Sequence, residues 1–171
     1  MNILALDLSL TATGVCTPTG ETETLHTKLK GMERLDWILD KIIDHVQPGH
    51  PDNRVDLVVI EGYSFGSQGR AVFNIGELGG VVRLGLWDID IPYVDIPPTC
   101  LKKFATGRGN SSKDDVLQAG VMRSGHTFTD NNACDAWWLW EMALTHYEPE
   151  KAVKMPAGNL TALEKISWWE R

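Results

Sequence analysis

Three acidic residues lie where apolar segments give way to polar sequence. Asp7 follows the apolar residues 3–6, Glu61 follows the apolar residues 57–60, and Asp135 lies near the start of a Trp-rich segment. A buried acid is costly unless it is paired, protonated or bound to a cation. Carboxylate oxygens are the ligands that hard divalent cations prefer. The sequence therefore predicts a shared divalent-metal site and, with it, phosphoryl-transfer chemistry.

Apolar runs and apolar periodicity predict the elements that must position these acids. Short apolar runs bounded by turn residues predict strands at 2–8, 13–17, 22–28, 55–60 and 92–96. Apolar residues at helical spacing predict a helix at 31–47, and we also expect helices at 70–88, 97–105, 112–123 and 131–146. We expect residues 107–112 to form a flexible loop. Several glycines inside 70–88 would weaken that helix, so they indicate close packing against another backbone.

The order of these elements predicts an α/β fold. The first three strands form an antiparallel meander, and strands and helices alternate after it. We expect a mixed sheet of about five strands flanked by helices, with Asp7 and Glu61 on adjacent central strands. Residues 1–148 would form the functional domain, and residues 149–171 a polar, loosely patterned C-terminal tail.

Composition narrows the class of protein. The chain has 171 residues, enough for one domain with a full core, and no apolar run long enough to span a membrane. Its three cysteines are scattered, which argues against disulfides and structural zinc and favours a reducing compartment. We expect no membrane partner, no signal peptide, and a cytoplasmic protein (in the host cytoplasm if a phage encodes it).

The net charge of −7 argues mildly against a nucleic-acid partner. The basic residues are unevenly distributed, however, and one group of them falls within a short segment: Lys102, Lys103, Arg108 and Lys113. Such a basic segment on an acidic body can still grip DNA locally, with a strong dependence on salt.

Several segments resemble, in order, the motifs of RuvC-type Holliday-junction resolvases. Asp7-Leu8-Ser9-Leu10-Thr11-Ala12-Thr13-Gly14 resembles the first motif, and Val59-Ile60-Glu61 the second. Residues 98–103, Thr106-Gly107-Arg108-Gly109 and Lys113 resemble the basic segment, and residues 132–136 with 144–146 resemble the closing helix. The similarity covers roughly residues 1–146.

This resemblance implies a fold, an activity and a set of site residues. The fold would be ribonuclease H-like, and the protein a homodimer that cleaves phosphodiesters of four-way or otherwise branched DNA. Two Mg²⁺ or Mn²⁺ ions per active site would be held by Asp7, Glu61 and Asp135. Lys102 and Lys113 match family lysines close to the scissile phosphate, and DNA contacts would include Lys103 and Arg108.

The chain departs from the family pattern at two positions. The family usually has an acid three residues before the last one, where this chain has Asn132. Asn132 shares a helix face with Asp135 and can offer a metal only a neutral amide oxygen; Asp130 could contribute only from the helix cap. The family also has an aromatic residue three positions after the second acid, where this chain has Ser64. Tyr63 and Phe65 flank that position, and either can stack on an unpaired base.

Two other functions remain open from the sequence. Asn132 is consistent with a catalytically weakened protein that binds branched DNA. The segment from Asp7 to Gly14 also resembles the phosphate loop of actin-like and sugar-kinase phosphotransferases, but those enzymes need two such domains around the nucleotide. We further expect Trp137, Trp138 and Trp140 to pack in the core or in a dimer interface rather than to contact DNA.

Overall fold

The central strands are buried on both sides, which explains why the sheet carries helices on both faces. The structure, a computed structural model, describes residues 1–47, 54–63 and 70–170. Its strands are β1 (Ile3–Asp7), β2 (Thr13–Cys16), β3 (Thr22–Leu25), β4 (Leu57–Glu61) and β5 (Tyr93–Ile96). Ile3 and Ala5 of β1 pack into one core, and Leu4 and Leu6 pack into the other.

The strands form one mixed sheet in the order β3-β2-β1-β4-β5. β1 pairs with β2, and β2 with β3, in antiparallel fashion, which confirms the predicted meander. β1 pairs with β4, and β4 with β5, in parallel. Because β1 and β4 are adjacent and parallel, Asp7 and Glu61 lie at the same edge of the sheet, as the sequence predicts.

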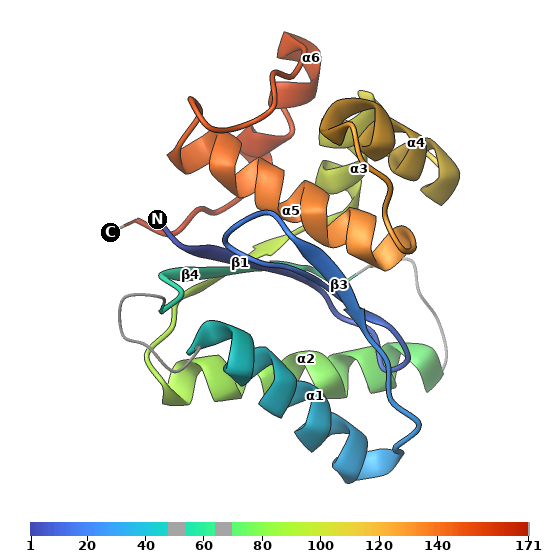
Figure 1. Ribbon diagram of the computed structural model, residues 1–171, viewed down its shortest axis with the longest axis vertical. Helices are drawn as coiled ribbons and strands as arrows, with labels where there is room; N and C mark the ends of the chain where they lie inside the picture. Colours follow the sequence, from blue (N-terminus) through green and yellow to red (C-terminus); the bar gives the residue numbers. More distant parts are fainter. Residues whose placement is uncertain (48–53, 64–69, 171) are drawn as a thin grey trace.

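The helices divide between the two faces of the sheet (Figure 1). α1 (Gly31–Val46) and α2 (Arg70–Asp88) cover one face. The other face carries α3 (Pro98–Thr106), α4 (Lys113–Ser124) and α5 (Asn131–Tyr147), followed by α6 (Ala157–Leu160) and a short 3₁₀ helix, η2 (Leu163–Lys165). α5 packs directly on β1 and β2. In the part of the chain that the structure describes, no helix is long and apolar enough to cross a membrane.

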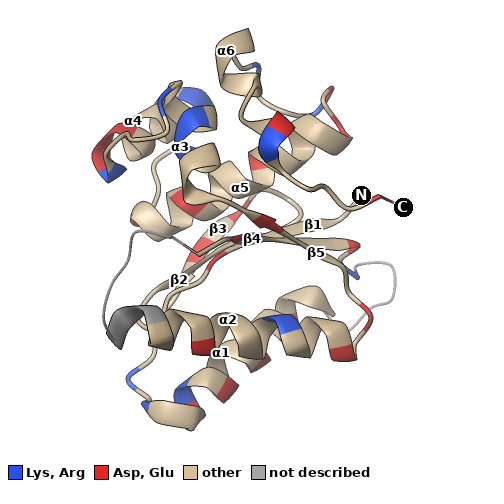
Figure 2. Cartoon of the chain, turned by 180° about the vertical axis from the view of Figure 1, so that it is seen from behind, with Lys and Arg blue, Asp and Glu red and all other residues tan. Residues whose placement is uncertain are grey.

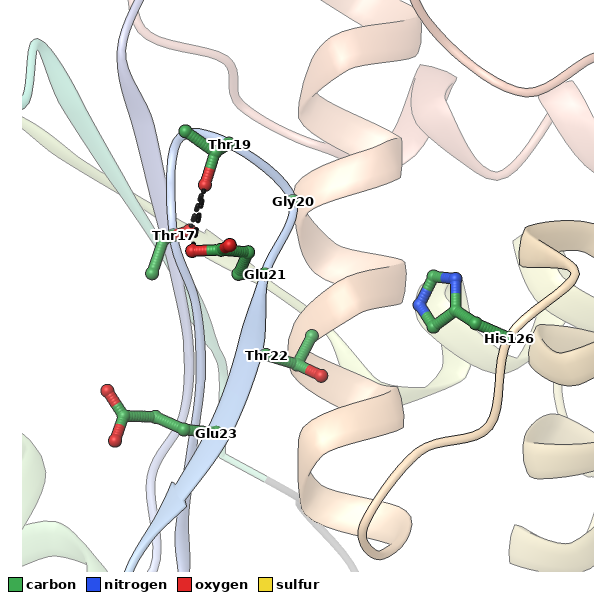
Figure 3. A pocket seen from close by; sticks show the side chains of 7 residues that line it. All are labelled: Thr17, Thr19, Gly20, Glu21, Thr22, Glu23 and His126. Atoms are coloured by element: carbon green, nitrogen blue, oxygen red, sulfur yellow. Dashed lines mark hydrogen bonds between the residues drawn. The ribbon is translucent and has the colours of Figure 1, made fainter.

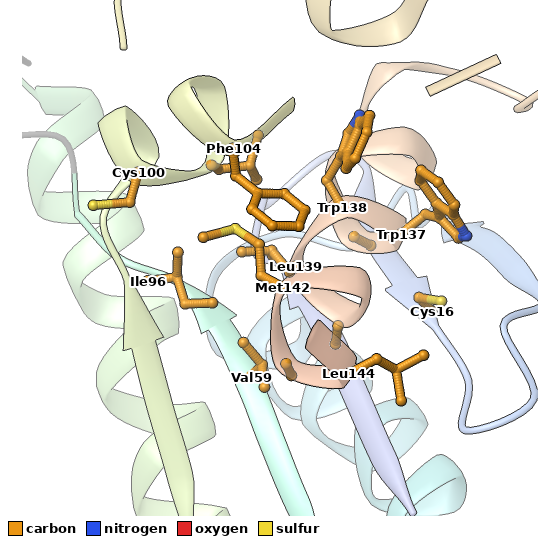
Figure 4. Close-up of a cluster of buried hydrophobic side chains, with 14 of the residues drawn as sticks. Cys16, Val59, Ile96, Cys100, Phe104, Trp137, Trp138, Leu139, Met142 and Leu144 are labelled. Atoms are coloured by element: carbon orange, nitrogen blue, oxygen red, sulfur yellow. The ribbon is translucent and has the colours of Figure 1, made fainter. Parts of the chain in front are cut away.

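The core between the sheet and α5 combines aliphatic side chains with large aromatic ones (Figure 4). Trp137 and Trp138 are buried, and Phe104 of α3 meets Trp138 edge to face at 5.8 Å. The Trp138 indole donates a hydrogen bond to the Val116 carbonyl at 3.1 Å, which ties α5 to α4. Trp140 is partly buried beside the same core. These tryptophans therefore serve as packing residues, as expected.

The C-terminal tail packs more closely than its polar sequence indicates. Ala162 and Ile166 are buried in the same core as the tryptophans of α5. Val153 donates its amide to the buried Glu141 carboxylate at 2.9 Å, and the Asn159 amide donates to the Phe104 carbonyl at 2.7 Å. The tail thus lies against α3 and α5 through contacts that the sequence pattern does not reveal.

Candidate active site

The site is built where β1 and β4 end, because both strands deliver a carboxyl group there. Asp7 is only 6% exposed, and Glu61 is half-buried at the end of the neighbouring strand. The two side chains are linked by a hydrogen bond, so the pair shares a proton. Burial, followed by the charge of Asp7, raises the pKa of Glu61 to about 9. Burial also raises the pKa of Asp7.

Asp135 reaches the same edge of the sheet from the first turns of α5. It is 9% exposed, and burial followed by the charge of Asp7 raises its pKa to about 7. Asp135 in turn contributes to the raised pKa of Glu61. The three predicted acids are therefore close enough to affect one another, although each comes from a different element.

A glycine allows α5 to come this close. Gly14 lies opposite Asp7 in the β1–β2 pair. A Cβ atom at Gly14 would lie 2.0 Å from the backbone carbonyl oxygen of Asn132, a distance at which the two backbones must move apart. Gly14 is thus the residue that brings the start of α5, with Asn132 and Asp135, onto the sheet beside Asp7.

The start of α5 is fixed by Asp130. Its side chain caps the helix by accepting the Ala133 amide at 2.9 Å, and it accepts the Thr24 hydroxyl at 2.9 Å. Asp130 still raises the pKa of Asp7 and Asp135 through its charge. The cap position that the sequence allows for Asp130 is therefore confirmed, and its carboxylate is already engaged within the protein.

Lysines from two helices face the acids. Lys113, the first residue of α4, lowers the pKa of Asp7, Glu61 and Asp135, and Lys102 of α3 lowers that of Asp135. Lys103 and Arg108 lie on α3 and in the segment that follows it. Figure 2 shows that the basic residues of α3 and α4 lie on the same side of the sheet as α5. The structure thus places Lys102 and Lys113 near the acids, as predicted.

The segment between α3 and α4 is not the open, flexible loop that its glycines and serines suggest. The Thr106 hydroxyl lies 2.7 Å from the Ser111 hydroxyl and donates to the Lys102 carbonyl at 2.8 Å. Ser111 is buried and donates to the Arg108 carbonyl at 3.1 Å. Ser112 and Asp115 then form a capping box at the start of α4. These bonds fix the position of Lys113 relative to α3.

The donor set of this site suits a hard divalent cation. Three carboxylates and Asn132 offer oxygen ligands. Burial, followed by repulsion between the acids, raises the pKa of Glu61 and Asp135, and a bound cation would favour their charged forms. Among the described residues, no three His, Cys, Asp or Glu side chains lie close enough to enclose an ion as they stand. The acids therefore fit a cation chemically, and binding one would have to displace the proton that Asp7 and Glu61 share.

Of the two aromatic residues expected to contact DNA, only Tyr63 lies within the described residues. Tyr63 is 43% exposed, and its hydroxyl accepts a hydrogen bond from Arg83 of α2 at 3.0 Å. Sequence reasoning does not single out Arg83, because nothing in its local pattern differs from that of an ordinary helix surface. Phe65 and Ser64 lie outside the described residues.

Two surface hollows lie beside these elements. A hollow of about 630 Å³ between α3 and α4 is lined by Thr106, Arg108, Asp115 and Arg123, among others. The other, of about 600 Å³, lies beside the β2–β3 turn (Figure 3). Threonines and Glu21 and Glu23 line this second hollow together with His126, so its acidic rim does not suit a polyanion.

The comparisons with known proteins point in one direction. No family model matches the chain. A crossover junction endodeoxyribonuclease RuvC of Cytophaga hutchinsonii is 27% identical over 128 residues, which cover 74% of this chain and 60% of that protein. The enzyme of the same name from Porphyromonas gingivalis is 31% identical over 90 residues, covering 53% of this chain and 44% of that protein. One from a Synechococcus species is 32% identical over 90 residues, which cover 53% of this chain and 57% of that protein. The aligned part thus spans about half the length of these relatives.

Solved structures agree in fold. Thermus thermophilus RuvC superposes with a TM-score of 0.65 at 19% identity, covering 91% of this chain and 100% of that one. T. thermophilus RuvC in complex with a Holliday junction substrate gives a TM-score of 0.67 at 19% identity, and the match covers 91% of this chain and 99% of that one. The predicted ribonuclease H-like α/β fold and the resemblance to RuvC-type proteins are both confirmed.

Proposed function

We propose that this RuvC-like protein is a metal-dependent endonuclease that cleaves phosphodiester bonds in four-way DNA junctions. The observation that carries the proposal is the meeting of Asp7, Glu61 and Asp135 at one edge of the sheet, with Lys102 and Lys113 facing them. The names of the relatives describe a crossover junction endodeoxyribonuclease, an activity that this set of residues suits. One structural relative is described in complex with a Holliday junction substrate.

Asp7, Glu61 and Asp135 would hold two Mg²⁺ or Mn²⁺ ions, with the amide oxygen of Asn132 as a neutral additional ligand. When bound, such ions activate water and stabilise the negative charge that develops on the leaving oxygen. The acids must first lose the proton that Asp7 and Glu61 share, and the cationic Lys113 favours that loss because it lowers the pKa of all three acids. Lys102 and Lys113 would also steady the scissile phosphate.

Basic residues next to the site would bind the DNA backbone. Lys102, Lys103, Arg108 and Lys113 lie on α3, on α4 and in the segment between them. Each phosphate contact releases counterions, so junction binding should weaken steeply with salt despite the net charge of −7. We assign Tyr63, and Phe65 beyond the described residues, to stacking on unpaired bases at the branch point.

Cleavage is tested with a synthetic four-way junction and a linear duplex of matched sequence. We expect paired cuts in the junction with Mg²⁺ or Mn²⁺, and none in chelator or in the duplex. Binding of the junction without any cut in either metal would instead support the weakened DNA-binding protein. Equal cleavage of junction and duplex would contradict the specificity that we propose.

We further propose that the protein works as a symmetric homodimer joined through α2, because two matched cuts in a junction need two active sites. Leu78, Val82 and Leu86 of α2 are fully buried in the sheet core, so they cannot form the interface between subunits. The opposite face of the helix carries the exposed apolar side chains of Phe73, Leu84 and Trp87. The same face includes Gly76 and Gly80, where an added Cβ atom would meet open space. This face permits close approach of a second helix.

The dimer is tested by light scattering of Leu84→Glu. Leu84 is 60% exposed, so a glutamate should leave the fold intact while it blocks a helix–helix contact. The matched control is Met122→Glu, because Met122 is also exposed but lies on α4. We expect a dimer for the wild type and the control and a monomer for Leu84→Glu. A wild-type monomer at micromolar concentration, with and without junction, would contradict the proposal.

A further inference from the structure

Arg83 of α2 links Tyr63, the helix and strand β5 in a single network. Its Nη1 donates to the Tyr63 hydroxyl at 3.0 Å and to the Gly79 carbonyl at 2.8 Å. Its Nη2 pairs with Asp95 Oδ1, and its Nε donates to Asp95 Oδ2 at 3.4 Å. The guanidinium carbon also lies 4.9 Å from the Tyr63 ring centroid, within the range of a cation–π contact.

The backbone of α2 is shaped to receive the tyrosine. A Cβ atom at Gly79 would lie 2.2 Å from the Tyr63 hydroxyl oxygen, so any other residue there would push the ring away. The Tyr63 hydroxyl also donates to the Gly76 carbonyl at 3.4 Å. A glycine inside a helix is destabilising relative to alanine, so its presence here has a packing reason. The position of the Tyr63 hydroxyl on α2 is thus fixed by its hydrogen bonds and by the space that Gly79 leaves for it.

The network leaves the ring accessible and the arginine occupied. Tyr63 is 43% exposed, whereas the Arg83 side chain is only 13% exposed. All three guanidinium nitrogens of Arg83 already bond to groups of the protein. Arg83 is therefore poorly placed to bind a phosphate itself, while Tyr63 offers an aromatic surface two residues after Glu61.

We propose that Arg83 is a positioning residue that holds Tyr63 as a fixed platform on which an unpaired base at the branch point stacks. The inference rests on the proposed function for its substrate. A platform ordered before binding loses little conformational entropy when the base docks, so stacking contributes more to affinity. The platform would also hold the base near the end of β4. Tyr63 lies two residues after Glu61, the last residue of that strand, and the Gly62 amide between them donates to the Ile96 carbonyl at 2.8 Å.

The test is junction binding in chelator, with the fluorescent base 2-aminopurine at the branch point. Stacking on an aromatic ring quenches this base, and chelator makes the result independent of cleavage. We expect the wild type to quench it, and Tyr63→Leu to lose the quench and bind about 5- to 150-fold more weakly, the range for one stacked base. Arg83→Met should lose most of the quench, and in the Tyr63→Leu background it should change affinity less than about twofold, because the two residues act as one unit.

Further variants separate positioning from folding and from direct contact. Tyr63→Phe keeps the ring but loses the bonds to Arg83 and Gly76, so an intermediate quench is expected. Arg34→Met on α1 is the control for loss of an arginine charge, and thermal melts check that each variant is folded. The proposal is overturned if Arg83→Met weakens binding equally with and without Tyr63, if Tyr63→Phe quenches like the wild type, or if Tyr63→Leu leaves the quench unchanged. If the wild type quenches 2-aminopurine but does not cleave the junction with Mg²⁺ or Mn²⁺, the proposed nuclease activity is contradicted and this inference is retained.

Discussion

The proton shared by Asp7 and Glu61 gives the site a measurable pH signature. The pKa of Glu61 is raised from its ordinary 4.5 to about 9, so the folded protein holds this proton more tightly than the unfolded chain does. The resulting stability is fully present below about pH 4.5 and is lost as the pH rises through about 9. At alkaline pH the charged acids therefore lower the free energy of unfolding, unless a bound cation offsets their repulsion.

Glu61→Gln should remove most of this dependence. In chelator, we expect the melting temperature of the wild type to fall more between pH 6 and pH 9 than that of the variant, which should be the more stable protein at pH 9. Added Mg²⁺ should stabilise the wild type more than the variant, because only the wild type keeps all the charged ligands. Melting curves that shift in parallel with pH would show that Glu61 does not titrate as the geometry requires.

The neutral ligand at position 132 should limit metal affinity. Asn132→Asp adds a charged oxygen on the Asp135 face of α5, so it should lower the Mg²⁺ concentration for half-maximal cleavage by about 10-fold or less, given the repulsion from Asp7 and Asp135. Asp130→Asn should have little effect, because its carboxylate already serves as the helix cap and asparagine caps helices equally well. The reverse pattern in a metal titration would assign the fourth-ligand role to Asp130.

Elements are positioned by contacts between distant segments, and Gly14 is the clearest case. Gly14→Ala would place a methyl group 2.0 Å from the Asn132 carbonyl oxygen, so α5 must move away from β2. We expect a loss of about 2–4 kcal/mol of stability and of nearly all cleavage, since Asp135 moves with the helix. Gly158→Ala is the control, because a methyl group there meets open space. A Gly14→Ala protein that melts and cleaves like the wild type would show that the approach of α5 does not depend on this glycine.

The sequence predicts most of the strands and helices and where they bring the three acids together. Buried apolar runs mark β1 and β4, and helical spacing marks α1 and α5, because each pattern reflects which side chains face a core. The order of the family-like motifs also predicts that Asp7, Glu61 and Asp135 meet. Local patterns do not reveal that Ser111 is buried, since its burial depends on how the segment after α3 folds back on Thr106 and Arg108. They likewise cannot show which face of α2 meets the sheet, because both faces carry apolar residues.

The whole molecule combines a ribonuclease H-like scaffold with a site that carries both acidic and basic side chains. The acids lie at the edge where β1 and β4 end, and α3 and α4 bring lysines towards them over the same face of the sheet. An acidic protein can then bind a polyanion through one basic region. We therefore predict that binding and cleavage are separable: loss of an acid should slow cleavage with little effect on binding, whereas loss of a basic residue should weaken binding.

The central claim is that these acids carry out the chemistry, and junction assays of Asp7→Asn, Glu61→Gln and Asp135→Asn test it most directly. Cleavage with Mg²⁺ and junction affinity in chelator should be measured side by side. We predict that each variant binds the junction within a few-fold of the wild type and cleaves it at least about 100-fold more slowly, because a charged ligand is lost with little change in volume. Near-normal cleavage by any one of the three would contradict the account for that residue, and near-normal cleavage by all three would place the active site elsewhere.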